Sequence, residues 1–134
     1  MAKKYKYQAE FEIHCDPKRL YQYISTPSGL QSWFADRVIP INDKMYDMIW
    51  DKQSHPARIV SKRQNSHIKF QFLDPSGSEE DLNYIEFRID YSEITQTSFL
   101  HITDYSEMTE KSDLDDLWNK LVGYLLDAIG SHIH

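Results

Sequence analysis

Strict alternation of apolar and polar residues near the start of the chain predicts a β-strand. The alternation runs from residue 5 to residue 15. A period of two is typical of a strand that buries one face and exposes the other. The apolar positions are Tyr5, Tyr7, Ala9, Phe11 and Ile13.

Two short helices are expected next, because two dipeptides each combine a capping residue with a proline. Asp16-Pro17 and Thr26-Pro27 both have this form. The first residue of each pair can accept a hydrogen bond at the N-cap, and proline is tolerated in the first helical position. The apolar residues that share one face after the second signal are Leu30, Trp33 and Phe34.

The middle of the chain reads as short strands separated by turn-forming residues. Asn42-Asp43, a polar turn over residues 51–54 and a long polar loop over residues 74–81 mark three of the breaks. Hairpin connections of this kind predict an antiparallel meander. The expected strands cover residues 38–41, 45–50, 57–61, 67–72, 84–91 and 97–103.

The last segment predicts a long helix with one apolar face. Ser112 and Asp115 resemble a capping box at its start. About 18 residues would span roughly 27 Å, enough to lie across a sheet of five or six strands. We expect Trp118 and Leu121 to pack against that sheet. The apolar positions are Leu114, Leu117, Trp118, Leu121, Val122, Leu125, Leu126 and Ile129.

The length of the chain fits one domain over residues 1–134 with its own core. The expected fold class is α+β, of the helix-grip type. It has a six- to seven-stranded curved antiparallel sheet around a long C-terminal helix, with two short helices after the first strand.

Charge and cysteine content indicate which cellular compartment and which classes of partner to expect. Cys15 is the only cysteine, and the net charge is −6. We therefore expect a cytoplasmic protein without disulfides, with no nucleic-acid partner, because phosphate binding needs clustered Lys and Arg. The N-terminus does not read as a signal peptide, and no segment has the roughly 20 apolar residues of a membrane span.

The order of elements and two local motifs resemble the START-like superfamily, also called SRPBCC. Residues 26–34 (TPSGLQSWF) and residues 117–122 (LWNKLV) are similar to segments of homologues of the activator of the ninety-kilodalton heat-shock chaperone ATPase. The resemblance implies a cavity between sheet and terminal helix. Different members of the superfamily use this cavity to bind lipids, hormones or polyketides, to cyclise polyketides, or to contact a chaperone.

Aromatic and aliphatic residues are the candidate lining of such a cavity, although each could instead fill the core. We expect an apolar cavity with a few polar groups. The candidate ligand-binding residues are Trp33, Phe34, Trp50, Phe70, Phe72, Phe87, Leu100, Trp118, Leu121 and Val122.

Other side chains give weaker signals for chemistry. The spacing of the six histidines, among them His132 and His134, gives no ligand set, so we expect no metal and no cofactor. Cys15 and His14 are adjacent on a strand and point to opposite faces, which argues against a nucleophile with its base. His101 is expected on the outer face between Leu100 and Ile102, with a role as a cavity acid or base left open.

Three functions remain open. The leading hypothesis is a non-enzymatic binding module for a small apolar or amphipathic molecule. The second is an accessory protein that docks onto a chaperone or another partner through the acidic segment from Asp104 to Asp116, which holds six acidic residues and one basic residue. The third is an enzyme acting on a polyketide-like substrate.

Overall fold

A computed structural model describes residues 3–107 and 110–130. Its seven strands form one antiparallel sheet in the order β1-β7-β6-β5-β4-β3-β2. The strands are β1 (Tyr5–Ile13), β2 (Arg37–Asn42), β3 (Met45–Trp50), β4 (Gln53–Arg63), β5 (His67–Phe72), β6 (Tyr84–Ser92) and β7 (Thr97–Ser106). The helices are α1 (Pro17–Ser25), α2 (Pro27–Gln31) and α3 (Lys111–Ile129).

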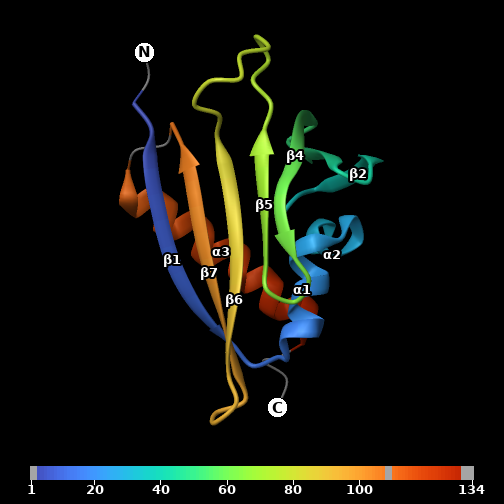
Figure 1. The fold of residues 1–134 in the computed structure, drawn as a ribbon. Helices are drawn as coiled ribbons and strands as arrows, with labels where there is room; N and C mark the ends of the chain where they lie inside the picture. Colours follow the sequence, from blue (N-terminus) through green and yellow to red (C-terminus); the bar gives the residue numbers. More distant parts are fainter. Residues whose placement is uncertain (1–2, 108–109, 131–134) are drawn as a thin grey trace.

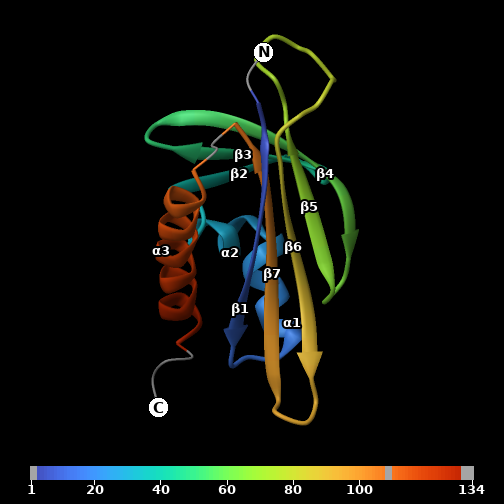
Figure 2. The ribbon, with the colours of Figure 1, turned by 90° about the vertical axis from the view of Figure 1, so that its left-hand side faces the viewer.

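The sheet curves around α3. Strands β2 to β7 follow one another as a meander, and β1 pairs with β7 at the far edge. The register shifts at Pro40/Asn42 and Ile59/Ser61 mark irregularities in β2 and β4, and bulges of this kind bend a strand. Figure 2 shows the β2–β4 end of the sheet curving towards the N-terminal end of α3. This is the expected α+β helix-grip architecture.

Both short helices begin at the predicted caps. The Asp16 side chain accepts a hydrogen bond from the Arg19 N–H at 2.9 Å, and Thr26 accepts one from Gly29 at 3.0 Å. Gly29 also lets the two helices approach closely, because a Cβ there would lie 2.1 Å from the carbonyl oxygen of Gln22. The segment carrying Trp33 and Phe34 is thereby held close to α1.

Sequence-based boundaries need correction at the turn between β3 and β4 and at the start of α3. The turn between β3 and β4 takes only Asp51 and Lys52, both with positive φ, so β4 begins at Gln53 and the expected turn over residues 51–54 is too long. Two successive residues with positive φ are what a tight hairpin turn requires. The N-cap of α3 is Glu110, without a side-chain hydrogen bond, so Ser112 does not form the expected capping box.

Helix α3 runs across one face of the sheet (Figure 1), and hydrogen bonds attach it to the rest of the fold near both of its ends. Near the N-terminus, the Tyr7 hydroxyl donates to Asp115 at 2.6 Å. At the C-terminus, Arg19 and Tyr23 of α1 donate to the carbonyl oxygens of Ile129 and Ala128 at 2.6 Å and 3.2 Å. The position of α3 over the concave face is therefore fixed at both ends.

The apolar face of α3 is mostly buried. Leu114, Trp118, Val122, Leu125 and Ile129 are buried in the core, as expected. Leu117 is 38% exposed, which corrects its assignment to the buried face. In the described part of the chain, no helix is both long and apolar enough to cross a membrane.

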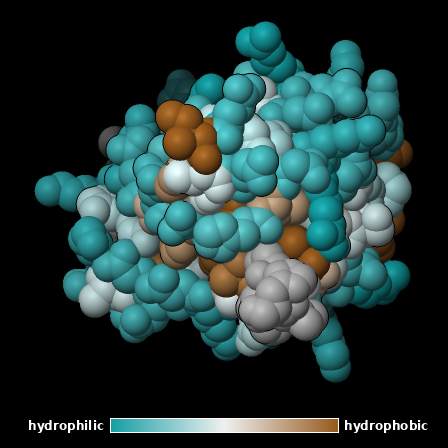
Figure 3. Space-filling model, turned by 90° about the horizontal axis from the view of Figure 1, so that it is seen from below, coloured by the Kyte–Doolittle hydropathy of each residue, from teal (hydrophilic) through white to brown (hydrophobic). Residues whose placement is uncertain are grey.

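Exposed apolar residues are scattered. The lower end of the molecule is mostly hydrophilic, with small separate apolar areas (Figure 3). Single exposed apolar residues are normal for a folded protein. The described residues therefore form no broad apolar patch on this face. The large exposed hydrophobic residues are Ile39, Ile41, Val60, Tyr91, Ile94, Leu117 and Tyr124.

Truncation of Leu125, which is fully buried, tests the packing of α3. We expect Leu125→Ala to lower the free energy of unfolding by about 2–5 kcal/mol, the usual effect of large-to-small changes in a core. Tyr124→Ala alters the adjacent residue, which is 46% exposed, and should change stability by less than about 1 kcal/mol. Equal losses for the two variants in urea unfolding would contradict this packing.

Candidate functional site

A cavity of about 940 Å³ lies between the N-terminal half of α3 and strands β3 to β7. We call it the α3 cavity. It opens to solvent beside Asp51, Ser54, Asp74 and Pro75, which are all exposed. Its apolar walls are built from Phe34, Trp50, Phe72, Ile85, Leu114, Leu117, Trp118 and Leu121.

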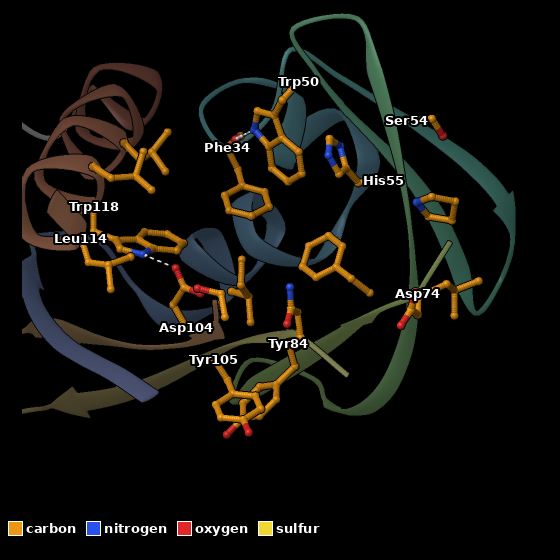
Figure 4. A pocket seen from close by; sticks show the side chains of 18 of the residues that line it. Phe34, Trp50, Ser54, His55, Asp74, Tyr84, Asp104, Tyr105, Leu114 and Trp118 are labelled. Atoms are coloured by element: carbon orange, nitrogen blue, oxygen red, sulfur yellow. Dashed lines mark hydrogen bonds between the residues drawn. The ribbon is translucent and has the colours of Figure 1, made fainter. Parts of the chain in front are cut away.

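Phe34 connects two walls of the α3 cavity. Its ring stacks on Trp118 of α3 at 5.8 Å and meets the edge of Trp50 of β3 at 5.1 Å. The indole N–H of Trp50 donates to the Phe34 carbonyl oxygen at 2.7 Å. The cap at Thr26 and the close packing of α1 and α2 therefore position an aromatic group between helix and sheet (Figure 4).

Asp104 of β7 is the buried carboxylate of the cavity wall. It is 7% exposed, and its Oδ2 accepts a hydrogen bond from Trp118 Nε1 at 2.9 Å. Burial raises the pKa of Asp104 above its usual range, although hydrogen bonds from Trp118 and Ser106 act in the opposite direction. A carboxylate out of water favours partners that carry positive charge or hydrogen-bond donors.

Two further polar side chains line the cavity. His55 of β4 lies against Trp50 with ring centroids 5.1 Å apart, and its Nδ1 is 3.3 Å from the carbonyl oxygen of Met48. Asn83, just before β6, has a buried Oδ1 with no hydrogen-bond partner in the described part of the chain. His55 and Asp104 lie on different sides of the space, with Phe34 between them in Figure 4.

The ten residues expected to bind a ligand divide into two groups. Phe34, Trp50, Phe72, Trp118 and Leu121 line the α3 cavity. The other five are buried in the core and are not part of its lining: Trp33, Phe70, Phe87, Leu100 and Val122. Trp33 illustrates the second group, because its ring packs on Phe34 and Phe87 and its Nε1 donates to the Tyr23 carbonyl oxygen at 2.8 Å.

The acidic segment is not one continuous surface. Asp104 faces the cavity, and Asp115 accepts hydrogen bonds from Tyr7 and Lys111. Glu107, Glu110, Asp113 and Asp116 are exposed. Residues 108 and 109 of this segment, like His132 and His134, lie outside the described residues.

His101 lies on the outer face, as the alternation around it predicts. Its Nε2 is 2.8 Å from Asp90 Oδ2 and its Nδ1 is 3.4 Å from Glu10 Oε2. Leu100 and Ile102 on either side are buried. His101 is therefore separated from the cavity by the sheet and cannot serve there as acid or base.

Sequence reasoning missed Asp104, His55 and Asn83 as cavity residues. For Asp104 a signal was present, because it continues the inward period of two set by Leu100 and Ile102. The expected strand ended at residue 103, just before Asp104, whereas β7 continues to Ser106. His55 and Asn83 carry no comparable pattern, since the first lies between the expected turn over residues 51–54 and the next expected strand, and the second follows the long loop.

Comparison with known proteins identifies the family. The family model of the START-like superfamily domain matches residues 1–131. The chain belongs to the START-like superfamily. A Bacteroides fragilis protein with a solution NMR structure is 37% identical to this START-like chain, with 96% of this chain and 93% of that chain covered and a TM-score of 0.64.

More distant solved structures share the START-like fold. The Aha1 dimer from Colwellia psychrerythraea is 16% identical, covers 93% of this chain and 92% of its own, and has a TM-score of 0.69. XoxI from Bacillus cereus is 12% identical, with 100% and 99% covered and a TM-score of 0.73. At such identities the similarity concerns the fold alone. Among curated proteins, none matches the chain.

The raised pKa of Asp104 predicts a definite pH dependence of stability. The folded state holds this proton more tightly than the unfolded chain, whose Asp pKa is about 3.9. The resulting stabilisation is full below that value and is lost as the pH rises through the raised pKa. The free energy of unfolding of Asp104→Asn, relative to the unaltered protein, should therefore increase between about pH 4 and pH 7.

Asp115→Asn is the matched control for this experiment. Hydrogen bonds from Tyr7 and Lys111 lower the pKa of Asp115, so its stabilisation is present at higher pH and is lost as the pH falls. Its relative free energy of unfolding should change with the opposite sign, below about pH 4. Urea unfolding at pH values below and above about pH 4 measures both effects. A flat or falling curve for Asp104→Asn would contradict the burial of an ionisable group at this position.

Proposed function

We propose that this START-like domain binds a small apolar or amphipathic molecule in the α3 cavity. The observation that carries the proposal is an open space with apolar walls and few polar groups inside an otherwise packed core. Its volume of about 940 Å³ falls within the range of small-molecule sites, roughly 300–1,000 Å³. Aromatic rings from four separate segments border it: Phe34, Trp50, Phe72 and Trp118.

The expected affinity follows from the apolar area that a ligand would bury. About 300 Å² of apolar surface gives on the order of 7 kcal/mol at 25 cal/mol per Å², before the costs of association are subtracted. We therefore expect an unoptimised probe to bind with micromolar affinity at best. A ligand with a polar group matched to the cavity would bind more tightly.

The enzyme and docking hypotheses have less support. Acid–base catalysis needs groups that converge on one reacting atom, and the cavity's His55 and Asp104 lie on different sides of the space (Figure 4). Docking through the acidic segment would lack Asp104, which faces inward. The cytoplasmic location stays a prediction.

A cavity-filling substitution tests the proposed function. Leu121 lines the cavity and is half-buried, so Leu121→Trp should fill part of the space and weaken binding of the neutral dye Nile red at least about tenfold, through lost contact area and steric conflict. Tyr124→Trp makes a similar addition on the same helix outside the cavity lining and should change the affinity less than twofold. Dye emission during titration gives both values.

Two results would contradict the proposal. One is the absence of saturable Nile red binding to the folded, unaltered protein. The other is equal affinity of Leu121→Trp and the unaltered protein for Nile red, which would show that the dye binds outside the α3 cavity. Near-ultraviolet circular dichroism shows whether each variant keeps its tertiary packing.

A further inference from the structure

Three hydrogen-bond donors in the wall of the α3 cavity are already used within the protein. Trp118 Nε1 donates to Asp104 and Trp50 Nε1 donates to the carbonyl oxygen of Phe34, at 2.9 Å and 2.7 Å. The Ser54 hydroxyl donates to Asp47 at 2.5 Å. A ligand that enters the cavity therefore finds these three donors engaged.

Hydrogen-bond acceptors in the cavity wall, in contrast, can accept further hydrogen bonds. A carboxylate has about four lone-pair sites, and the Asp104 side chain has hydrogen bonds only from Trp118 and Ser106 among the described residues. Asn83 has a buried Oδ1 to which no described residue donates a hydrogen bond. When the Nδ1–H of His55 donates to the Met48 carbonyl oxygen, its Nε2 is an acceptor as well.

The charges around the cavity also favour a ligand with a positively charged group. Among the described residues, its lining contains Asp51, Asp74 and Asp104 and neither lysine nor arginine. Asp51 and Asp74 lie at the exposed mouth, and Asp104 lies deep beside Trp118. Because screening by water is weak at buried sites, the potential in the cavity opposes an anionic head group and attracts a cationic one.

We propose that the α3 cavity selects amphiphiles with a primary ammonium group, which donates its hydrogen bonds to Asp104 while the alkyl or aryl body packs against Phe34 and Trp118. This inference rests on the proposed function and specifies its ligand class. The ammonium group supplies the positive charge that the described lining lacks, together with donors for the free acceptor sites of Asp104. It also offsets the desolvation of the carboxylate, the cause of the raised Asp104 pKa.

The test compares three probes with the same ten-carbon chain: decylammonium, 1-decanol and decanoate. Each is titrated at neutral pH below its micelle concentration, with displacement of Nile red as the readout. We expect decylammonium to bind at least about tenfold more tightly than decanol, because charge-assisted hydrogen bonds are the strong ones. Decanoate should bind more weakly than decanol.

Two variants separate recognition by Asp104 from a general effect of the negative protein. Asp104→Asn and Asp74→Asn both remove one negative charge from the cavity lining, so a purely global effect would be similar in both. We expect Asp104→Asn to lower the affinity for decylammonium about tenfold or more, and the affinity for decanol by a clearly smaller factor. Asp74→Asn, at the exposed mouth, should lose less than threefold.

The outcomes distinguish this inference from the proposed function. If decanol binds but decylammonium binds no better, or if both variants lose affinity equally, the ammonium preference is wrong and the apolar cavity stands. If none of the three probes displaces the dye, both proposals fail. Decanol binding by Asp104→Asn shows that this variant is folded; if it does not bind, the probe ranking in the unaltered protein alone decides.

Discussion

Packing of α3 across the concave face of the sheet is the constraint on which the rest of the structure depends. The helix presents an apolar face that must be removed from water, and the curved sheet provides the opposing surface. Tyr7 holds the helix near its N-terminus, and Arg19 and Tyr23 hold it at its C-terminus. Because both ends are attached, the helix is held across the concave face of the sheet. The space left between its N-terminal half and strands β3 to β7 is the α3 cavity.

The pair formed by Trp118 and Asp104 gives this cavity its polar character. An aromatic residue on the inner face of a helix is ordinary core, and an acidic residue on the inner face of a strand is not. The indole N–H satisfies one carboxylate oxygen, so the buried acid is tolerated, although at the cost that its raised pKa reflects. The same contact uses the indole donor and leaves acceptor sites on the carboxylate. The Asp104 side chain would thus both support α3 and select the ligand.

The sequence predicted the architecture well because its signals are local. Alternation in the first strand, proline after each capping residue and the long apolar face of the last helix each depend on neighbouring residues only. Errors occurred where backbone conformation departs from the average, as at Asp51 and Lys52, whose positive φ values shorten the turn to two residues. The site was harder to predict. Whether Phe87 fills the core or Phe72 borders a cavity depends on the distance between helix and sheet, which hydrophobic periodicity does not encode.

The central claim is that the space beside Trp118 admits a small apolar molecule while the rest of the core stays closed. The three tryptophan indole N–H groups offer a direct test, because Trp50 and Trp118 line the cavity and Trp33 is packed in the core. Two-dimensional ¹H–¹⁵N spectra recorded during titration with 1-decanol follow all three. If 1-decanol binds in the α3 cavity, we expect saturable shifts of the Trp50 and Trp118 signals, with the Trp33 signal nearly unchanged. Three unmoved indole signals in the folded protein, or a shift of Trp33 alone, would contradict it.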